Sequence, residues 1–355
     1  MAKEPDFLER LLNASGPSGF ETAAARVWRE EAGGFGEEVW TDVTGNTVAS
    51  LNSQGKPRVM MAGHIDEIGL QITHVDENGF LFFGEIGGWD SQVLVGQRVR
   101  VLGRDGSVPG VVGKKPIHLL KQEERDKATR TRDLWVDLGV ESAQDVKDLG
   151  VRVGDPMVLD TGLVRLAGDR IASRAIDNRI GAYVVLEALR LLASEPPEAA
   201  VFAVATVQEE IGYSGGGARS SAFSLEPDVA LVVDVTFSTD APDLEKKELG
   251  DHKIGGGPVL SRGSANHPVV FDRLVEAAES EGIPYTIQAS PKATRTDADA
   301  IYLVRFGVPT CVVSVPNRYM HSPNELVSLS DLERSAALLA GFVRRLERNA
   351  DFRPL

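Results

Sequence analysis

The sequence is poor in cysteine and has no excess of basic residues. Cys311 is the single cysteine among 355 residues, which excludes a disulfide framework within the chain and is typical of reducing compartments. Lys and Arg total 38 against 52 Asp and Glu, a formal net charge of −14. Nucleic acids and anionic membranes attract basic surfaces, so we expect neither as a partner.

Long apolar runs are also missing. The most apolar stretch covers residues 199–207, far short of the roughly 20 residues that a membrane helix needs. The first residues include Glu4 and Asp6 and contain no apolar stretch, so no secretory signal is predicted. With 42% hydrophobic and 25% charged residues, we expect a soluble, cytoplasmic, globular protein of about two domains at roughly 150 residues each.

Short strand candidates alternate with turn signals between residues 69 and 164. Asn78-Gly79 and Asp105-Gly106 are typical of hairpin turns, and they separate the strand candidates 71–75, 80–83, 97–102 and 108–112. One short helix is predicted after Ser142, and the charged residues 121–132 are interpreted as a solvated loop. This pattern predicts a small β-barrel or sandwich.

The rest of the chain alternates strands with helices. Ser18 and Ser330 begin capping-box patterns ahead of predicted helices. The helix candidates are 22–32, 180–192, 268–281 and 331–347, and the strand candidates are 47–51, 58–62, 199–207, 229–233 and 310–315. We therefore predict an α/β domain of residues 1–68 plus 165–355, with a mixed central sheet flanked by helices, interrupted by a β-rich domain of residues 69–164.

Four of these strand candidates run into side chains that commonly bind metal ions. These side chains are His64 and Asp66 after 58–62, Glu209 and Glu210 after 199–207, Asp234 after 229–233, and His321 after 310–315. Sites in open α/β sheets form beyond the carboxyl ends of the strands, so we expect these groups to converge. The mixture of imidazole and carboxylate suits Zn²⁺ or a similar divalent ion.

Each of these signals has an ordinary structural explanation when it is taken alone. Asp177 or Asn178 could cap the helix that follows, and the Glu209-Glu210 pair could lie on an exposed loop. A lone His64 is more often a buried core histidine than a ligand. Asp66 lies two residues further along an extended chain and could accept a hydrogen bond from the other ring nitrogen. Cys311 is interpreted as an inert buried thiol.

The motifs occur in an order that resembles one known family. They are Gly63-His64-Ile65-Asp66-Glu67-Ile68-Gly69, Asp177-Asn178-Arg179, Gln208-Glu209-Glu210-Ile211-Gly212, Asp234-Val235, Thr296-Asp297-Ala298 and residues 316–323, with Lys115-Pro116-Ile117-His118-Leu119 in the insert. Together they resemble the glutamyl-aminopeptidase-like (tetrahedral aminopeptidase) family of co-catalytic metallopeptidases, which have a zinc-exopeptidase-like fold. The resemblance spans nearly the whole chain.

The resemblance implies a site for two divalent metal ions per subunit, Zn²⁺ first, with Co²⁺ or Mn²⁺ as alternatives. By the family pattern, His64 and Asp234 hold one ion, Glu210 and His321 hold the other, Asp177 bridges both, Glu209 is the general base, and Asp66 supports His64. The implied activity is removal of N-terminal residues from short peptides. In this family the inserted domain mediates assembly into dimers and a tetrahedral dodecamer.

The resemblance also suggests residues that could contact the substrate, but it defines them less well than the metal ligands. Arg295 stands where the family usually has Gly, and it either shapes the substrate side-chain pocket or lies at the surface. Asp297 and Arg318 are further candidates from the matching motifs.

Three other functions compete with this interpretation. A glycosidase also uses two carboxylates but leaves the two histidines unexplained. A deacylase or carboxypeptidase could use the same two-metal scaffold. A non-catalytic binding protein with a degenerate site is disfavoured by the complete set of predicted site residues.

Overall fold

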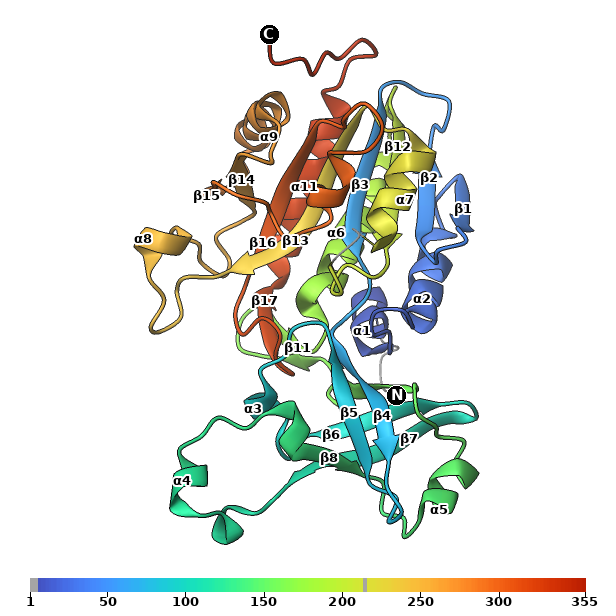
Figure 1. Ribbon diagram of the computed structural model, residues 1–355. Helices are drawn as coiled ribbons and strands as arrows, with labels where there is room; N and C mark the ends of the chain where they lie inside the picture. The colour runs from blue at the N-terminus through green and yellow to red at the C-terminus, as the bar shows by residue number, and fades with distance from the viewer. Residues whose placement is uncertain (1–5, 213–215) are drawn as a thin grey trace.

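The computed structural model describes residues 6–212 and 216–355 (Figure 1). Glu4, used above to argue against a secretory signal, lies outside these ranges. None of the helices in the described residues is long and apolar enough to cross a membrane.

The main sheet is mixed, as expected. Within the described residues it has the strand order β1-β2-β12-β3-β13-β16-β14-β15. These strands are β1 (Glu38–Thr41), β2 (Thr47–Leu51), β12 (Ala200–Thr206), β3 (Arg58–His64), β13 (Val229–Phe237), β16 (Thr310–Asn317), β14 (Val259–Gly263) and β15 (Thr286–Ser290). The central strands β12, β3, β13 and β16 are parallel, so their carboxyl ends reach the same edge.

Helices cover both faces of this sheet, which explains why its central strands are apolar throughout. Val59 and Met61 of β3 belong to one buried cluster with residues of α1 (Phe7–Asn13), α2 (Thr22–Ala32), α6 (Ile176–Ala193), α9 (Pro268–Ser280) and α11 (Leu329–Arg344). Met60 and Ala62 point the other way and pack with α7 (Gly216–Leu225) and α10 (Ala298–Ile301). Outside these two layers lies the short helix α8 (Lys246–Leu249), shown at the left of Figure 1.

The inserted segment forms a closed barrel below the main sheet in Figure 1. Its strands follow the order β4-β5-β8-β7-β6-β9, with bounds Gly69–Val75, Leu81–Ile86, Leu134–Asp137, Gly106–Lys114, Arg98–Gly103 and Pro156–Leu159. The predicted hairpins and small β-barrel are confirmed. The exact boundaries of the two domains stay predictions.

The barrel segment contains more helical turns than the one that was predicted. That helix is α5 (Ala143–Asp148), and Ser142 caps it as expected. The further turns are α3 (Ser91–Leu94), α4 (Gln122–Arg125) and two 3₁₀ turns, η1 (Ile117–Leu119) and η2 (Thr131–Asp133). The expected loop of residues 121–132 is therefore interrupted by α4 and the start of η2.

The two capping-box predictions are wrong, for different reasons. Ser18 does not cap α2, because its hydroxyl donates a hydrogen bond to Asp66. Glu21 accepts hydrogen bonds from the backbone N–H groups of Gly19 and Gln208 instead. Helix α11 begins at Leu329, before Ser330. Ser330 therefore lies within the helix and cannot be its N-cap. For Ser18 the competing partner is distant in the chain, so the local sequence pattern cannot report it.

A small sheet of β10 (Val164–Arg165), β11 (Arg170–Ser173) and β17 (Glu325–Ser328) lies next to α6 and the barrel. Its register pairs Ser173 with Glu325. This places the buried Glu325 carboxylate beside the start of α6, where it accepts the backbone N–H of Asp177.

A buried ion cluster ties the start of the chain to α6. Glu67 contacts both Arg174 and Arg179, with its Oε1 at 2.8 Å from Arg179 Nη2. Arg179 is fully buried and also donates to the carbonyl oxygens of Leu11 and Leu12. Burial would raise the pKa of Glu67, but the two guanidinium groups hold it below its usual value.

We expect Glu67→Gln to lower the free energy of unfolding by about 3–5 kcal/mol, because it leaves two buried cations without their counter-charge. Chemical denaturation monitored by circular dichroism measures this. Asp351→Asn, which removes the exposed pair with Arg353, is the matched control and should leave the unfolding midpoint unchanged. Equal midpoints for both variants would show that the cluster contributes nothing to stability.

Candidate metal centre

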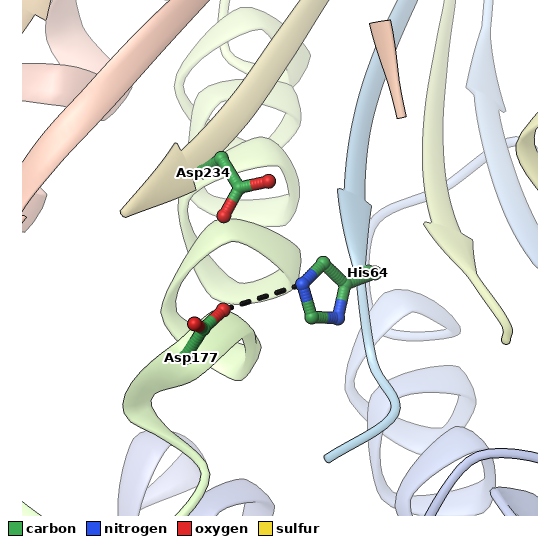
Figure 2. Close-up of side chains that lie close together, drawn as sticks. All are labelled: His64, Asp177 and Asp234. Atoms are coloured by element: carbon green, nitrogen blue, oxygen red, sulfur yellow. Dashed lines mark ion pairs between the residues drawn. The ribbon is translucent and has the colours of Figure 1, made fainter. Parts of the chain in front are cut away.

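Three acidic or imidazole side chains from three different elements meet at the carboxyl edge of the sheet (Figure 2). His64 is the last residue of β3, and Asp234 lies in β13. Asp177 lies at the kinked start of α6, where its backbone is not helical. His64 Nε2 lies 3.3 Å from Asp177 Oδ1, and all three side chains are buried. Each can offer one ligand atom to an ion, and these atoms lie within 4.8 Å of one another.

A second group of the same kind lies on the other side of Asp177. His321 Nε2 lies 3.3 Å from Asp177 Oδ2 and 3.4 Å from Glu210 Oε2. The ligand atoms of these three residues also lie within 4.8 Å of one another. Asp177 thus belongs to both groups and directs one oxygen to each histidine.

Asp66 organises two elements of the site at once. Its Oδ1 lies 3.3 Å from His64 Nδ1. The same carboxylate accepts the backbone N–H groups of Glu209 and Glu210, at 3.2 and 3.1 Å. A fully buried carboxylate therefore orients the His64 ring and fixes the turn that carries both glutamates.

Glu325 has a comparable position under the other histidine, and sequence reasoning missed it. Its Oε2 accepts the backbone N–H of Asp177 and its Oε1 accepts that of His321, both at 2.7 Å. Only 2% of this residue is exposed. The available signal was a single acid at the start of the short, fully buried strand β17.

Two carboxyl groups of the site have raised pKa values. Burial raises the pKa of Glu209 to about 10, and the carboxylates of Asp234 and Asp297 add to the effect while His64 opposes it. Burial also raises the pKa of Asp234 well above its usual value. These shifts mean that the chain does not fully compensate the negative charge of ionised Glu209 and Asp234. Asp177 differs, because His321 and His64 outweigh its burial and lower its pKa.

The residues present fit a divalent cation. Glu210 Oε1 is buried and has no hydrogen-bond partner among the described residues. Buried polar atoms are normally paired, so an unpartnered oxygen on the carboxylate whose other oxygen faces His321 points to a missing positive partner. Imidazole nitrogen with carboxylate oxygen is a donor set that Zn²⁺ and similar ions accept.

A cavity of about 970 Å³ opens next to these groups, and Glu209, Arg295 and Asp297 are among its lining residues. Arg295 is exposed, whereas Asp297 is buried and contacts Thr206. The structure does not bring Arg318 to this cavity lining. Its guanidinium instead pairs with Asp240, with Nη2 at 2.7 Å from Oδ2.

Among the described residues, neither Cys311 nor His252 belongs to a ligand group. Cys311 and His252 are buried, and burial raises the pKa of the thiol to about 12, which fits the inert role predicted for it. One exposed cavity residue, Arg219 of α7, was not anticipated. Its only signal in the sequence is an arginine two residues after the glycine pair that begins this helix.

Comparison with known proteins identifies the family. The M42 glutamyl aminopeptidase family profile matches residues 45–338, and the chain belongs to this family. A lysyl aminopeptidase of Pyrococcus furiosus is 33% identical over 98% of this chain and 99% of its own. The chain is accordingly a peptide hydrolase of the aminopeptidase class, as the motifs predicted.

Solved structures agree with this assignment. The TET aminopeptidase from the marine sediment archaeon Thaumarchaeota archaeon SCGC AB-539-E09 has a TM-score of 0.91 at 34% identity, covering 96% of both chains. The Pyrococcus horikoshii TET1 peptidase, which can assemble into a tetrahedron or a large octahedral shell, has a TM-score of 0.84 at 30% identity over 96% of this chain and 100% of its own.

We expect zinc to raise the thermal unfolding midpoint of chelator-treated protein by several degrees. The ion would compensate buried carboxylates that are unpaired in its absence, and free zinc at 100 times its Kd adds about 2.7 kcal/mol to folding. Differential scanning calorimetry measures the shift. Asp177→Asn should lose most of it, because this residue is common to both groups; an unchanged midpoint in the parent protein would contradict a cation site.

Proposed function

We propose that this protein removes N-terminal residues from short peptides at a centre of two divalent metal ions, with Glu209 as general base. The observation that carries this proposal is the sharing of Asp177 between two ligand groups. One ion would need only one of these groups. A second complete group that shares Asp177 with the first supports a second ion beside it.

His64, Asp177 and Asp234 would hold one ion, and Asp177, Glu210 and His321 would hold the other. Zn²⁺ suits this donor set best, with Co²⁺ or Mn²⁺ as alternatives. When bound, such a pair lowers the pKa of a water molecule and polarises the scissile carbonyl group.

Glu209 is suited to move the proton. It lines the cavity, and its Oε2 lies 3.7 Å from His64 Nε2, yet it belongs to neither ligand group. Its carboxylate would accept a proton from the attacking water and deliver it to the leaving amine. Asp66 accepts the backbone N–H groups of both Glu209 and Glu210. It would thereby hold the proposed base and the neighbouring metal ligand in fixed positions.

The finer points of substrate and assembly are also proposals. Arg295 and Asp297 line the cavity and would contact the peptide. Arg318 would act only indirectly, since Asp240 occupies its guanidinium. By analogy with the TET neighbours we propose assembly through the inserted barrel into dimers and a tetrahedral dodecamer. A cytoplasmic location stays a prediction from the sequence.

We expect Glu209→Gln to lower kcat by about 10²–10⁴-fold while the protein retains both ions, because the amide keeps the shape of the side chain but cannot accept the proton. Steady-state kinetics on an aminoacyl-anilide, with metal analysis of the same sample, measures both quantities. Glu209→Asp is the matched control and should recover part of the rate. Near-normal turnover of the glutamine variant would exclude Glu209 as the base.

Peptides with free and acetylated N-termini separate this activity from the deacylase and carboxypeptidase alternatives. We expect cleavage of the free peptide at its first bond and no cleavage of the acetylated form, because the proposed reaction acts at the amino end. Mass spectrometry of the products identifies the bond. Release of acetate, or of the C-terminal residue, would instead support one of the two alternatives.

A further inference from the structure

The two proposed ligand histidines have different environments. The His64 side chain is 2% exposed, and its Nδ1 faces Asp66 within the α/β part of the chain. The His321 side chain is 33% exposed, and its Nδ1 lies 2.7 Å from the backbone oxygen of Gly88. Gly88 belongs to the barrel segment, between β5 and α3. The ring nitrogen of His321 that faces away from Asp177 therefore bonds to the backbone of the inserted domain.

The contact with Gly88 favours the tautomer of His321 that can bind a metal ion through Nε2. A carbonyl oxygen can only accept, so Nδ1 must donate its hydrogen to Gly88. In the neutral ring, Nε2 then carries the lone pair, and Nε2 is the atom that faces Asp177 and Glu210 at 3.3 and 3.4 Å. Outer partners of this kind fix the tautomer and direction of ligand histidines.

The position of Gly88 depends on the preceding residue. Gly87 has a φ of +75°, and a Cβ atom there would meet Ile68 Cγ2 at 2.5 Å and Glu210 Cβ at 3.5 Å. The backbone at Gly87 thus lies directly against Ile68, which follows His64 closely in the chain, and close to Glu210 of the second ligand group. A side chain at residue 87 would have to lift this connection away from the site.

We infer that the Gly87-Gly88 connection is a positioning element for one half of the metal centre. It sets the affinity of the ion held by Asp177, Glu210 and His321, and leaves the ion held by His64, Asp177 and Asp234 largely unaffected. This inference rests on the proposed two-metal function. It gives the inserted barrel a direct part in the site, in addition to any part in assembly.

Gly87→Ala tests the inference, with Gly139→Ala as its matched control. Gly139 lies in the same barrel segment and has the same φ of +75°, but a Cβ there would meet nothing within 4 Å. Both variants therefore carry the same backbone strain, and only Gly87→Ala displaces the connection. Adding Ile68→Ala to Gly87→Ala removes the nearest clashing atom and should restore the contact.

The measurement is zinc titration of metal-free protein against a competing chelator, with bound zinc counted after dialysis. His321→Ala identifies which binding phase belongs to the second half of the centre. In Gly87→Ala we expect that phase to weaken about 10–100-fold, as for loss of an outer partner. The other phase should stay within about threefold, and the Ile68→Ala double variant should recover most of the loss.

Several results would overturn the inference. These are unchanged binding in Gly87→Ala, an equal loss in Gly139→Ala, equal weakening of both phases, and failure of the double variant to recover. Parent protein that binds fewer than two ions would contradict the proposed function itself, and with it this inference. Two ions in the parent and an unchanged Gly87→Ala variant would contradict the inference alone.

Discussion

Asp177 is a buried carboxylate that directs one oxygen to each of two histidines, and the arrangement of the site depends on this sharing. Glu209 and Asp234 lie beside it, and their raised pKa values indicate negative charge that the chain does not neutralise. Such an arrangement is costly for a protein unless a cation compensates it. Its presence at the edge of an otherwise apolar sheet is the strongest physical reason to place a metal centre there.

A shell of backbone contacts makes that sharing possible. Asp66 holds the backbone N–H groups of Glu209 and Glu210, and Glu325 holds those of Asp177 and His321. Each carboxylate therefore links residues that are distant in the chain. Because ligand geometry tolerates little displacement, these buried links hold the ligands in place.

The sequence could predict the ligands because they follow strong local patterns. His64 and Asp234 end apolar runs that became parallel strands, and parallel strands bring their carboxyl ends together. Glu325 and Gly88 could not be found this way, since their contacts are with backbone atoms brought close only by the fold. For the same reason the capping predicted for Ser18 is wrong: Asp66 competes for the hydroxyl through a contact between distant residues.

The most direct test of this account is anomalous diffraction at the zinc absorption edge from crystals grown with excess zinc. We predict two strong peaks on either side of the Asp177 carboxylate, one next to His64 and Asp234 and the other next to Glu210 and His321. A single peak, or peaks away from Asp177, would contradict the claim that this carboxylate is shared by two metal ions.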